Sequence, residues 1–489
     1  MSSSRKRILD GSVLAYVLVI MTVVSILLVS MLTFISSQIK NGAYAVGREQ
    51  AFQAAEQGIQ FYKWYLAHQT DGRSAAQVET FWNSGSPFGI GSDYVVSVSD
   101  PSGGVMGTFT LRVTPPEPGS TIAVVESTGE SARFPGKTRT IRVRFRRPSW
   151  SESAVLADHF VRFGDGTEVF GKIHVNDGLR FDGFVHNVVT SSVESVNELD
   201  HSGNAEFGVH THVNRPPSTG VNDSFRPLEA PPNTVSERSD VFGAGREFPI
   251  SVVDFDGVSS ELGYMKTEAQ SGHGIYFNSA ENGRRIILRT DGTFDECRVR
   301  TYNTSTFMPT NYARNTGSGT CTSCGGNNCT RNHPIPDGGI IFVEDHVWIS
   351  GQINGQKITV VAADFAGTGS ERSIFIPNDL RYTNYDGSDI IGIMAQKDVE
   401  IPRDSEDNLR IDAALLAQLG RVGRSDYGNS KSTITVFGAI ATYSRYGFAY
   451  TDGTGYHDRN LYYDNNLLYY PPPYFPTGTQ YHIDLWEEL

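Results

Sequence analysis

The sequence has fewer basic than acidic residues, and it lacks the catalytic motifs that are recognisable from residue spacing. Its 489 residues include 41 lysines and arginines against 54 acidic residues, which gives a formal net charge of −13. Because a nucleic-acid-binding face needs a net positive potential, we expect no nucleic-acid partner. The motifs HExxH, GxxxxGKS/T and GxSxG are absent as well. We therefore expect no enzymatic activity and no cofactor, with an exported carbohydrate-active β-helix enzyme as an alternative that rests on analogy alone.

Proline is missing from residues 12–68, and the first part of this stretch also lacks charge. The run Ser12–Ile35 has no charged residue. A helix of this length, at about 1.5 Å per residue, crosses the ~30 Å hydrocarbon core of a bilayer. Arg5, Lys6 and Arg7 precede the run, and such positive charge holds a terminus in the cytoplasm. We expect a single-pass protein of the cytoplasmic membrane whose remaining chain is exported to the cell surface.

The helix is expected to continue beyond the membrane. From residue 36 to residue 68, apolar residues recur mostly at three- and four-residue steps, which is the period of an amphipathic helix. These residues are Ile39, Ala43, Val46, Phe52, Ala55, Ile59 and Tyr62. The pattern predicts one continuous rod of roughly 55 residues, about 85 Å long. A secretory signal peptide has a shorter apolar region and a small-residue cleavage site.

A short basic leader ending in Gly11, the apolar helix, and the run Arg48–Glu56 (REQAFQAAE) together resemble the N-terminus of PilX-type minor pilins of type IV pili. The resemblance ends near residue 65. It implies that a prepilin peptidase cuts on the cytoplasmic side of the membrane, after Gly11. The cut would release residues 1–11 and leave Ser12 as the new N-terminus.

The resemblance also implies which residues join the helix to its neighbours. Major pilins carry a glutamate at the fifth mature position, and Tyr16 occupies that position here. PilX-type pilins lack this acid too, so the departure suits a minor component better than a main fibre subunit. The assembly residues that the resemblance implies are Tyr16, Phe52, Ala55 and Glu56.

We therefore expect a minor pilin or pseudopilin-like structural component of a type IV pilus or a related secretion filament. Its helix would anchor it, and a large β domain would be displayed at the surface or tip. The expected partners are other pilins, the prepilin peptidase and the membrane, with a surface glycan or protein as a further candidate. A single-pass surface adhesin outside any filament is the alternative.

Short strands are expected after the rod and a short helical segment at Ala75–Trp82. Four runs rich in Val, Ile, Thr and Phe are separated by Gly and Pro turns. The runs are Tyr94–Ser99, Gly107–Val113, Thr121–Ser127 and Thr138–Arg146. They predict a four-stranded antiparallel sheet that packs on the amphipathic half of the helix.

Beyond Pro148 the expected strands become shorter and are punctuated by Asp-Gly pairs. Stacked short strands with glycine at their corners indicate a β-helix or β-solenoid, so the predicted fold class is α+β and mainly β. The residues from Gly338 onward, with Gly392–Ala395 and Ile411–Ala417, resemble an uncharacterised Gly- and Tyr-rich β domain that follows pilin helices. The predicted division is leader 1–11, helix 12–68, sheet head 69–148, first solenoid-like block 151–300 with a Pro-rich insert 215–240, Cys-containing loop 301–336 and C-terminal β domain 337–489.

The four cysteines are Cys297, Cys321, Cys324 and Cys329. An even number of cysteines in an exported protein favours disulfides, here two of them. The spacing Cys-x-x-Cys also suits a zinc site, which is the alternative. The sequence does not choose among the possible pairings.

Histidines and aromatic residues are the last candidates for binding. The histidines are His174, His186, His210 and His212. His210 and His212 are two residues apart, so on a strand they face the same side and could share a metal. Because no carboxylate follows them at a recognised spacing, we expect a solvated strand face and no metal ligand. The aromatic residues that crowd positions 443–481 are expected to cap the open end of the solenoid, with sugar or partner binding as the alternative.

Overall fold

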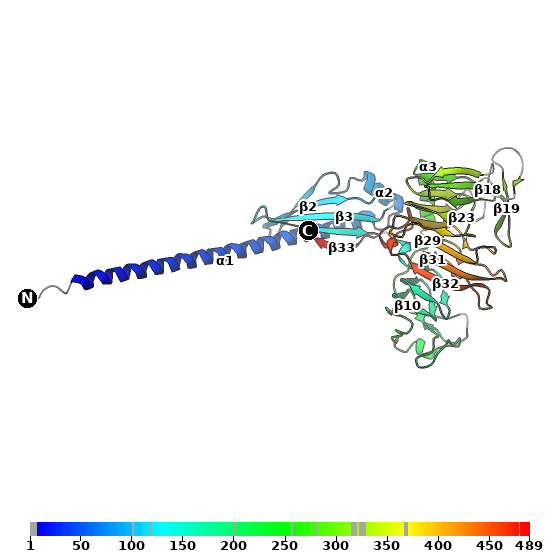
Figure 1. Cartoon of the computed structure of the whole chain (residues 1–489), viewed down its shortest axis with the longest axis horizontal. Helices are drawn as coiled ribbons and strands as arrows, with labels where there is room; N and C mark the ends of the chain where they lie inside the picture. Colours follow the sequence, from blue (N-terminus) through cyan, green and yellow to red (C-terminus); the bar gives the residue numbers. More distant parts are fainter. Residues whose placement is uncertain are drawn as a thin grey trace, which may run out of the picture.

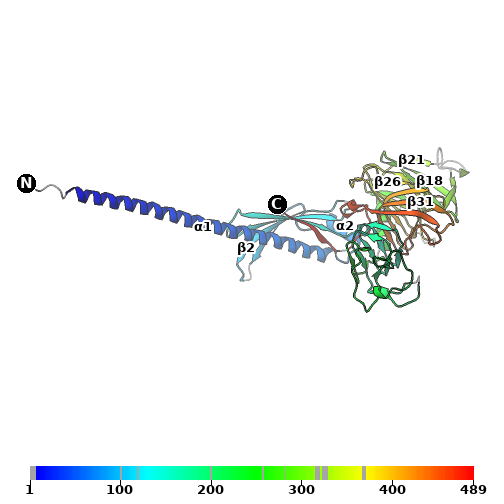
Figure 2. The same ribbon diagram turned by 60° about the horizontal axis from the view of Figure 1, so that its bottom comes forward.

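The computed structural model describes residues 7–99, 102–117, 120–198, 201–255, 258–279, 281–313, 320–321, 329–365, 370–478 and 480–489. Figures 1 and 2 show three parts: a long N-terminal helix, a small head around the C-terminal part of this helix, and a large body beyond the head. The N-terminus lies at the free end of the helix, whereas the C-terminus lies in the head. The predicted combination of a long apolar helix with a mainly β body is confirmed.

The helix α1 (Arg7–Thr70) runs without a break. At 1.5 Å per residue it is about 95 Å long. It ends just before Gly72, whose φ of +68° is the left-handed conformation that commonly terminates helices. The continuous rod predicted from the absence of proline is therefore confirmed.

The head contains an antiparallel sheet of five strands rather than the predicted four. In spatial order the strands are β1 (Tyr94–Ser99), β2 (Val105–Thr114), β3 (Ile122–Ser131), β4 (Thr138–Arg146) and β33 (His482–Glu488). The fifth strand comes from the C-terminus and pairs with β4. Four strands were predicted because only local sequence was considered, and β33 is separated from β4 by the whole body.

The head core lies between this sheet and the C-terminal part of α1. Ala55 and Ile59 of α1 pack with Leu111, Val125 and Val143, which come from three neighbouring strands. The alternation of buried and half-buried residues along β3 and β4 shows the period of two that a sheet with one covered face requires. The short helix α2 (Ala75–Ser84) begins with a capping box formed by Ser74 and Gln77 and joins the same core.

The body is inserted into the head between β4 and β33. The departing and returning segments lie side by side, because the Trp150 N–H donates to the Pro476 carbonyl (3.0 Å) and the Gly478 N–H donates to the Pro148 carbonyl (2.7 Å). The predicted C-terminal β domain 337–489 therefore includes a last segment that belongs to the head.

Two parallel ladders form most of the body. The longer one joins, in spatial order, β16 (Gly274–Phe277), β22 (Ile340–Val343), β24 (Lys357–Ala362), β27 (Ile390–Ala395), β29 (Asn408–Ala417), β31 (Ser430–Thr442), β5 (Val155–Ala157), β8 (Ile173–Val175), β11 (Val189–Ser191) and β15 (Arg246–Glu247). The other joins β17 (Gly283–Leu288), β23 (His346–Gln352), β25 (Ile374–Phe375), β28 (Val399–Glu400) and β30 (Val422–Gly423). Because β5 pairs with β31, the two blocks that the sequence separates share one ladder.

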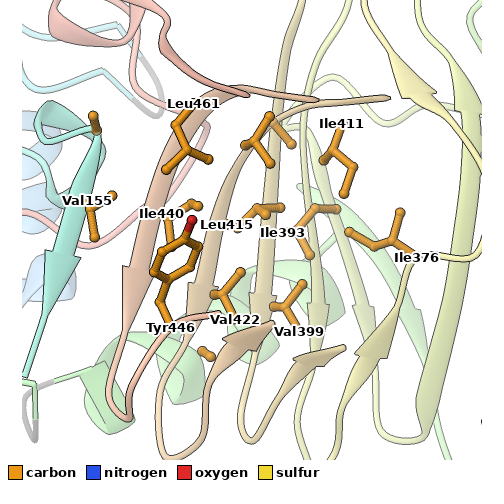
Figure 3. Packing of buried hydrophobic residues seen from close by; sticks show 14 of the residues in the cluster. Val155, Ile376, Ile393, Val399, Ile411, Leu415, Val422, Ile440, Tyr446 and Leu461 are labelled. Carbon is orange, nitrogen blue, oxygen red and sulfur yellow. The ribbon is translucent and has the colours of Figure 1, made fainter. Parts of the chain in front are cut away.

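The interior of the body is filled by side chains stacked from strand to strand. Val155, Ile440, Leu415 and Ile393 occupy aligned positions on successive strands, and each is almost completely buried. Figure 3 shows this row, with Val399 and Val422 stacked in the same way on the second ladder. Aligned β-branched and leucine side chains pack well on a pleated surface, which explains why these strands are apolar along their whole length.

A helix and an antiparallel arm complete the body. The helix α3 (Val258–Ser271), which was not predicted, packs its Leu262 and Met265 against the outer side chains of β22. The arm contains β18 (Thr293–Asn303), β19 (Met308–Ala313) and β21 (Cys329–Pro334), so the predicted loop 301–336 is partly strand. The Pro-rich insert 215–240 is mostly irregular, with one 3-10 turn at Pro227–Glu229.

Candidate functional site

The N-terminal half of α1 is an unusually exposed apolar surface. Every side chain described from Val13 to Gly42 is exposed. This part of the helix is long and apolar enough to cross a membrane, and its most apolar stretch is not buried against the rest of the chain. In water such a surface would cost free energy, so this half of the helix is built to be covered by lipid or by other apolar helices.

The predicted processing residues and Tyr16 lie on this free part of the helix. Gly11 and Ser12 are both within α1, where only the backbone is described. Tyr16 is 70% exposed, and the N-terminal part of α1 extends away from the head and body (Figure 1). The structure therefore leaves the side chain of Tyr16 available to a neighbouring molecule.

The other predicted assembly residues lie where α1 meets the head. Ala55 is fully buried in the head core, so it cannot contact another subunit and its assignment to assembly was wrong. Phe52 is half-buried and packs edge-on against Trp486 of β33, with the Arg139 guanidinium over its ring. Glu56 is exposed, so its side chain is available for contact with another subunit.

The cysteines lie in the antiparallel arm. Cys297 is fully buried and disulfide-bonded, and the register of β18 and β21 places it opposite Cys329. Cys321 ends β20 (Thr320–Cys321), while Cys324 lies outside the described residues. The prediction of two disulfides stays a prediction, since the side chains of Cys321 and Cys329 are not described.

His210 and His212 are buried, so the expected solvated strand face was wrong. They lie in and just after β14 (Val209–His210), and their side chains have no exposed surface. The side chains of Glu198, His201 and Glu206 converge on them, and four of these residues offer potential ligand atoms that all lie within 4.8 Å of one another. We refer to Glu198, His201, Glu206, His210 and His212 as the His–Glu cluster.

The two carboxylates of the His–Glu cluster are held in the charged form. Burial raises the pKa of Glu198, but His210 and the Arg180 guanidinium outweigh it and lower this pKa to about 2. Burial likewise opposes ionisation of Glu206, but His212, His210 and the Arg226 backbone N–H lower its pKa overall. The cluster therefore combines buried negative charge with imidazole rings.

The sequence did contain a signal for this cluster. All five residues fall between positions 198 and 212, and both carboxylates precede His210 and His212, whereas the spacing considered above has the acid after the histidines. Glu206 belongs to β13 (Glu206–Phe207), which pairs with β12 (Ser195–Val196) and brings the segment around Glu198 back toward β14.

The other two candidate histidines from the sequence, His174 and His186, are not part of the cluster. His174 is buried, lies 2.9 Å from the Thr190 hydroxyl and 3.2 Å from the Asn176 amide oxygen, and burial lowers its pKa to about 4. His186 lies on the surface, 2.7 Å from a Glu168 carboxylate oxygen. Each of these two imidazole rings therefore has a polar partner in its own surroundings and does not reach the His–Glu cluster.

The aromatic residues of positions 443–481 do not form one cap. Tyr456, Phe475 and Tyr481 are buried in three different hydrophobic clusters, of which the last belongs to the head. Tyr469 and Tyr470 are more than two-fifths exposed. These tyrosines and phenylalanines therefore link the body to the head as well as filling the body.

In sequence comparisons, no protein family and no curated protein matches the chain. Among solved structures, the chain is similar to the competence-associated pilin ComZ from Thermus thermophilus, with 14% identity and a TM-score of 0.32. The match covers 91% of this chain and 97% of that one. At this TM-score the likeness carries no argument about fold or function.

Proposed function

We propose that the protein is a membrane-anchored, pilin-like filament subunit and that its β body is displayed outside the cell. The free half of α1 carries this proposal, because its apolar side chains are exposed while the same helix runs without a break into the head core. A bilayer before assembly and a bundle of similar helices after assembly would both cover this surface. The assigned role is structural rather than catalytic.

The processing and orientation of the chain follow from its basic leader. Arg7 and the two basic residues before it would hold the N-terminus in the cytoplasm, with the head and body on the outer side. A prepilin peptidase would then act between Gly11 and Ser12, at the cytoplasmic end of α1. Interaction with other pilins would use the surface from Ser12 to the start of the head.

We also propose a minor rather than a major role. A phenol at position 16 cannot form the ion pair that a glutamate would form with a neighbour's N-terminal amine. The body is inserted in the head and extends well beyond it (Figure 1). Its two parallel ladders support a β-solenoid, and a glycan or protein at the cell surface is the ligand class we propose for it.

Mapping the N-terminus of the membrane-extracted protein tests this function. The wild-type chain should begin at Ser12, and Gly11→Val should leave the full-length precursor, because a branched side chain replaces the small residue at the cut. Gly42→Val is the matched control: this glycine is also helical, and a side chain there would meet nothing within 4 Å. We expect the control to be processed normally.

The same measurement separates the filament subunit from the alternative of a plain surface adhesin. A simple anchored adhesin would keep residues 1–11 in every variant. Normal cleavage of Gly11→Val, or an intact leader in the wild-type protein, would rule out the filament proposal.

A further inference from the structure

We propose that the His–Glu cluster binds one divalent first-row transition-metal ion, of the kind represented by Zn²⁺. Four side chains would supply the ligand atoms: Glu198, His201, Glu206 and His212. This site is independent of the N-terminal helix and would belong to the body whatever the body displays. The inference rests on the spacing of the ligand atoms, on the contacts that orient the His212 ring and the two carboxylates, and on the buried negative charge of the cluster.

The spacing of the potential ligand atoms matches a tetrahedral site. His201 Nε2 lies 2.9 Å from Glu198 Oε2 and 3.2 Å from Glu206 Oε2. His212 Nε2 lies 3.3 Å and 3.0 Å from the same two oxygens. Zinc bonds of about 2.0–2.2 Å in tetrahedral geometry separate neighbouring ligand atoms by about 3.3 Å. An ion between these four atoms would need little movement of the side chains.

His212 is held so that its Nε2 faces the two carboxylates. Its Nδ1 donates a 2.9 Å hydrogen bond to the carbonyl oxygen of Asn222. This contact turns Nε2 toward Glu198 Oε2 and Glu206 Oε2, at 3.3 Å and 3.0 Å. Nε2 is therefore the ring atom in position to bind an ion that the two carboxylates also bind.

His210 shows the same arrangement at the edge of the cluster. Its Nδ1 lies 2.8 Å from the carbonyl oxygen of Phe207, and its Nε2 lies 3.5 Å from the inner oxygens of Glu198 and Glu206. Both His210 Nε2 and Glu198 Oε2 are buried without a hydrogen-bond partner among the described residues. Buried polar atoms in folded proteins rarely lack partners, so Glu198 Oε2, which belongs to one of the four proposed ligands, indicates a missing ligand.

The outer oxygens of both carboxylates are already fixed. Glu198 Oε1 accepts from the Arg180 guanidinium at 3.0 Å, and Glu206 Oε1 accepts from the Arg226 backbone N–H at 2.7 Å. Each carboxylate is thereby turned so that Oε2 points into the cluster. Outer contacts of this kind orient metal ligands in known sites.

Charge also favours a cation. The buried guanidinium of Arg180 is shared among the carboxylates of Glu198, Asp182 and Asp223, and its contact with Asp182 is 2.6 Å long. Glu206 has no lysine or arginine side chain as an ion-pair partner within the described part of the chain. Buried charges are costly unless they are paired or coordinate a metal, so a divalent ion would stabilise the cluster.

The ligand set selects the class of metal. Imidazole nitrogens suit zinc and its first-row neighbours, while Ca²⁺ requires six to eight oxygen ligands. Four protein ligands leave no open position, which is typical of structural zinc sites. The ion would tie β13 to the segments around Glu198 and His212. Hydrogen bonds between the ligands His212 and Glu206 and the backbone of Asn222 and Arg226 would pass this restraint on to the insert 215–240.

Metal titration of the full-length protein in detergent tests the site. After chelator treatment and dialysis, Zn²⁺ alone is added in competition with a chromophoric chelator. We expect one zinc per chain and at least a tenfold loss of affinity in His201→Gln. His201 is chosen because its side chain is 9% exposed, so its replacement disturbs packing least. His186→Gln, which removes a surface histidine that also contacts a glutamate, should bind like the wild type.

A second readout identifies the ligands without any variant. The Co²⁺-loaded wild-type protein should show the visible bands of a tetrahedral nitrogen and oxygen site, with no thiolate charge-transfer band. Failure of the folded wild-type chain to bind zinc, or unchanged affinity in His201→Gln, would overturn the proposal. A single ion with a thiolate band would place the metal on the cysteines and would overturn it too.

Discussion

The indole N–H of Trp82 donates a 2.9 Å hydrogen bond to the phenolic oxygen of Tyr481, which lies 399 residues further along the chain. Both side chains are buried in the head. Trp82 lies in α2, before the chain enters the body, and Tyr481 immediately precedes β33. The head is therefore completed only after the whole body has been synthesised.

Removing the hydroxyl group of Tyr481 should destabilise the head. Tyr481→Phe keeps the ring but leaves the Trp82 N–H without an acceptor, which costs about 1–3 kcal/mol for a buried donor. Thermal denaturation in detergent, followed by tryptophan fluorescence, would measure the change. Tyr462→Phe, at a half-exposed tyrosine of the body, is the control and should be near neutral. Equal stability of the two variants would show that the hydrogen bond does not hold the head together.

The sequence predicted the helix and four head strands because these features depend on local patterns. Arg142, Arg144 and Arg146 alternate along β4, a pattern that by itself indicates a solvated face. In the structure these arginines contact acids of β33, for example Arg144 with Asp484 at 2.8 Å. The complementary charges are visible in the sequence, but nothing local says that positions 340 residues apart are neighbours.

The same limit applies to the body and to the His–Glu cluster. Short apolar strands indicated stacking, yet the pairing of β5 with β31 depends on where the chain enters the stack. The expectation for His210 and His212, a solvated strand face, failed in the same way. Burial of a histidine pair is decided by the strands around it, here β9 (Leu179–Phe181) beside β14.

A side chain at position 129 should separate the head sheet from α1. Gly129 lies in β3, and a Cβ there would collide with the backbone of Ala51 and Ala55. Gly129→Ala should therefore destabilise the head by about 1–3 kcal/mol, as overpacking does in other cores. Gly164→Ala is a suitable control because nothing lies within 4 Å of the added atom. Comparable melting temperatures of both variants would contradict the close contact.

The cysteines should be oxidised in the native protein. Cys297 is disulfide-bonded in the buried part of the antiparallel arm. We expect alkylation of the denatured, non-reduced protein to label no cysteine, and reduction to lower stability by about 2–4 kcal/mol. Mass spectrometry counts the labels. Labelling of all four cysteines before reduction would contradict both the structure and the predicted pair of disulfides.

Acid should destabilise the body through His174. Burial lowers the pKa of this imidazole to about 4, against about 6.5 in the unfolded chain. Between these values the unfolded state binds more protons, so stability is lost as the pH falls from about 6.5 to about 4, by roughly 3 kcal/mol in total. His174→Gln should be less stable near neutral pH but should lose less on acidification. Melting temperatures of this variant and of His457→Gln, an exposed control, would show whether the acid sensitivity is specific.

The last prediction concerns the position of the subunit in a filament. Tyr16 is 70% exposed on the free helix, so its side chain is available to a neighbour. Inside a bilayer or a helix bundle, attraction between rods comes from close packing and from polar groups that find partners. A subunit without an acid at this position cannot pair with the N-terminal amine of another subunit, but it can occupy the end of a bundle, where that pair is not needed.

We therefore expect immunogold labelling of the body to mark filament ends or the cell envelope at low copy number. Tyr16→Glu should still be inserted in the membrane but should also appear along the shaft, because the new carboxylate supplies the missing ion pair. Tyr16→Gln introduces a side chain of the same size as glutamate but without its charge. The labelling of this variant should match that of the wild type. Uniform labelling of the shaft by the wild-type protein would refute the terminal position, since the phenol would then be compatible with internal packing.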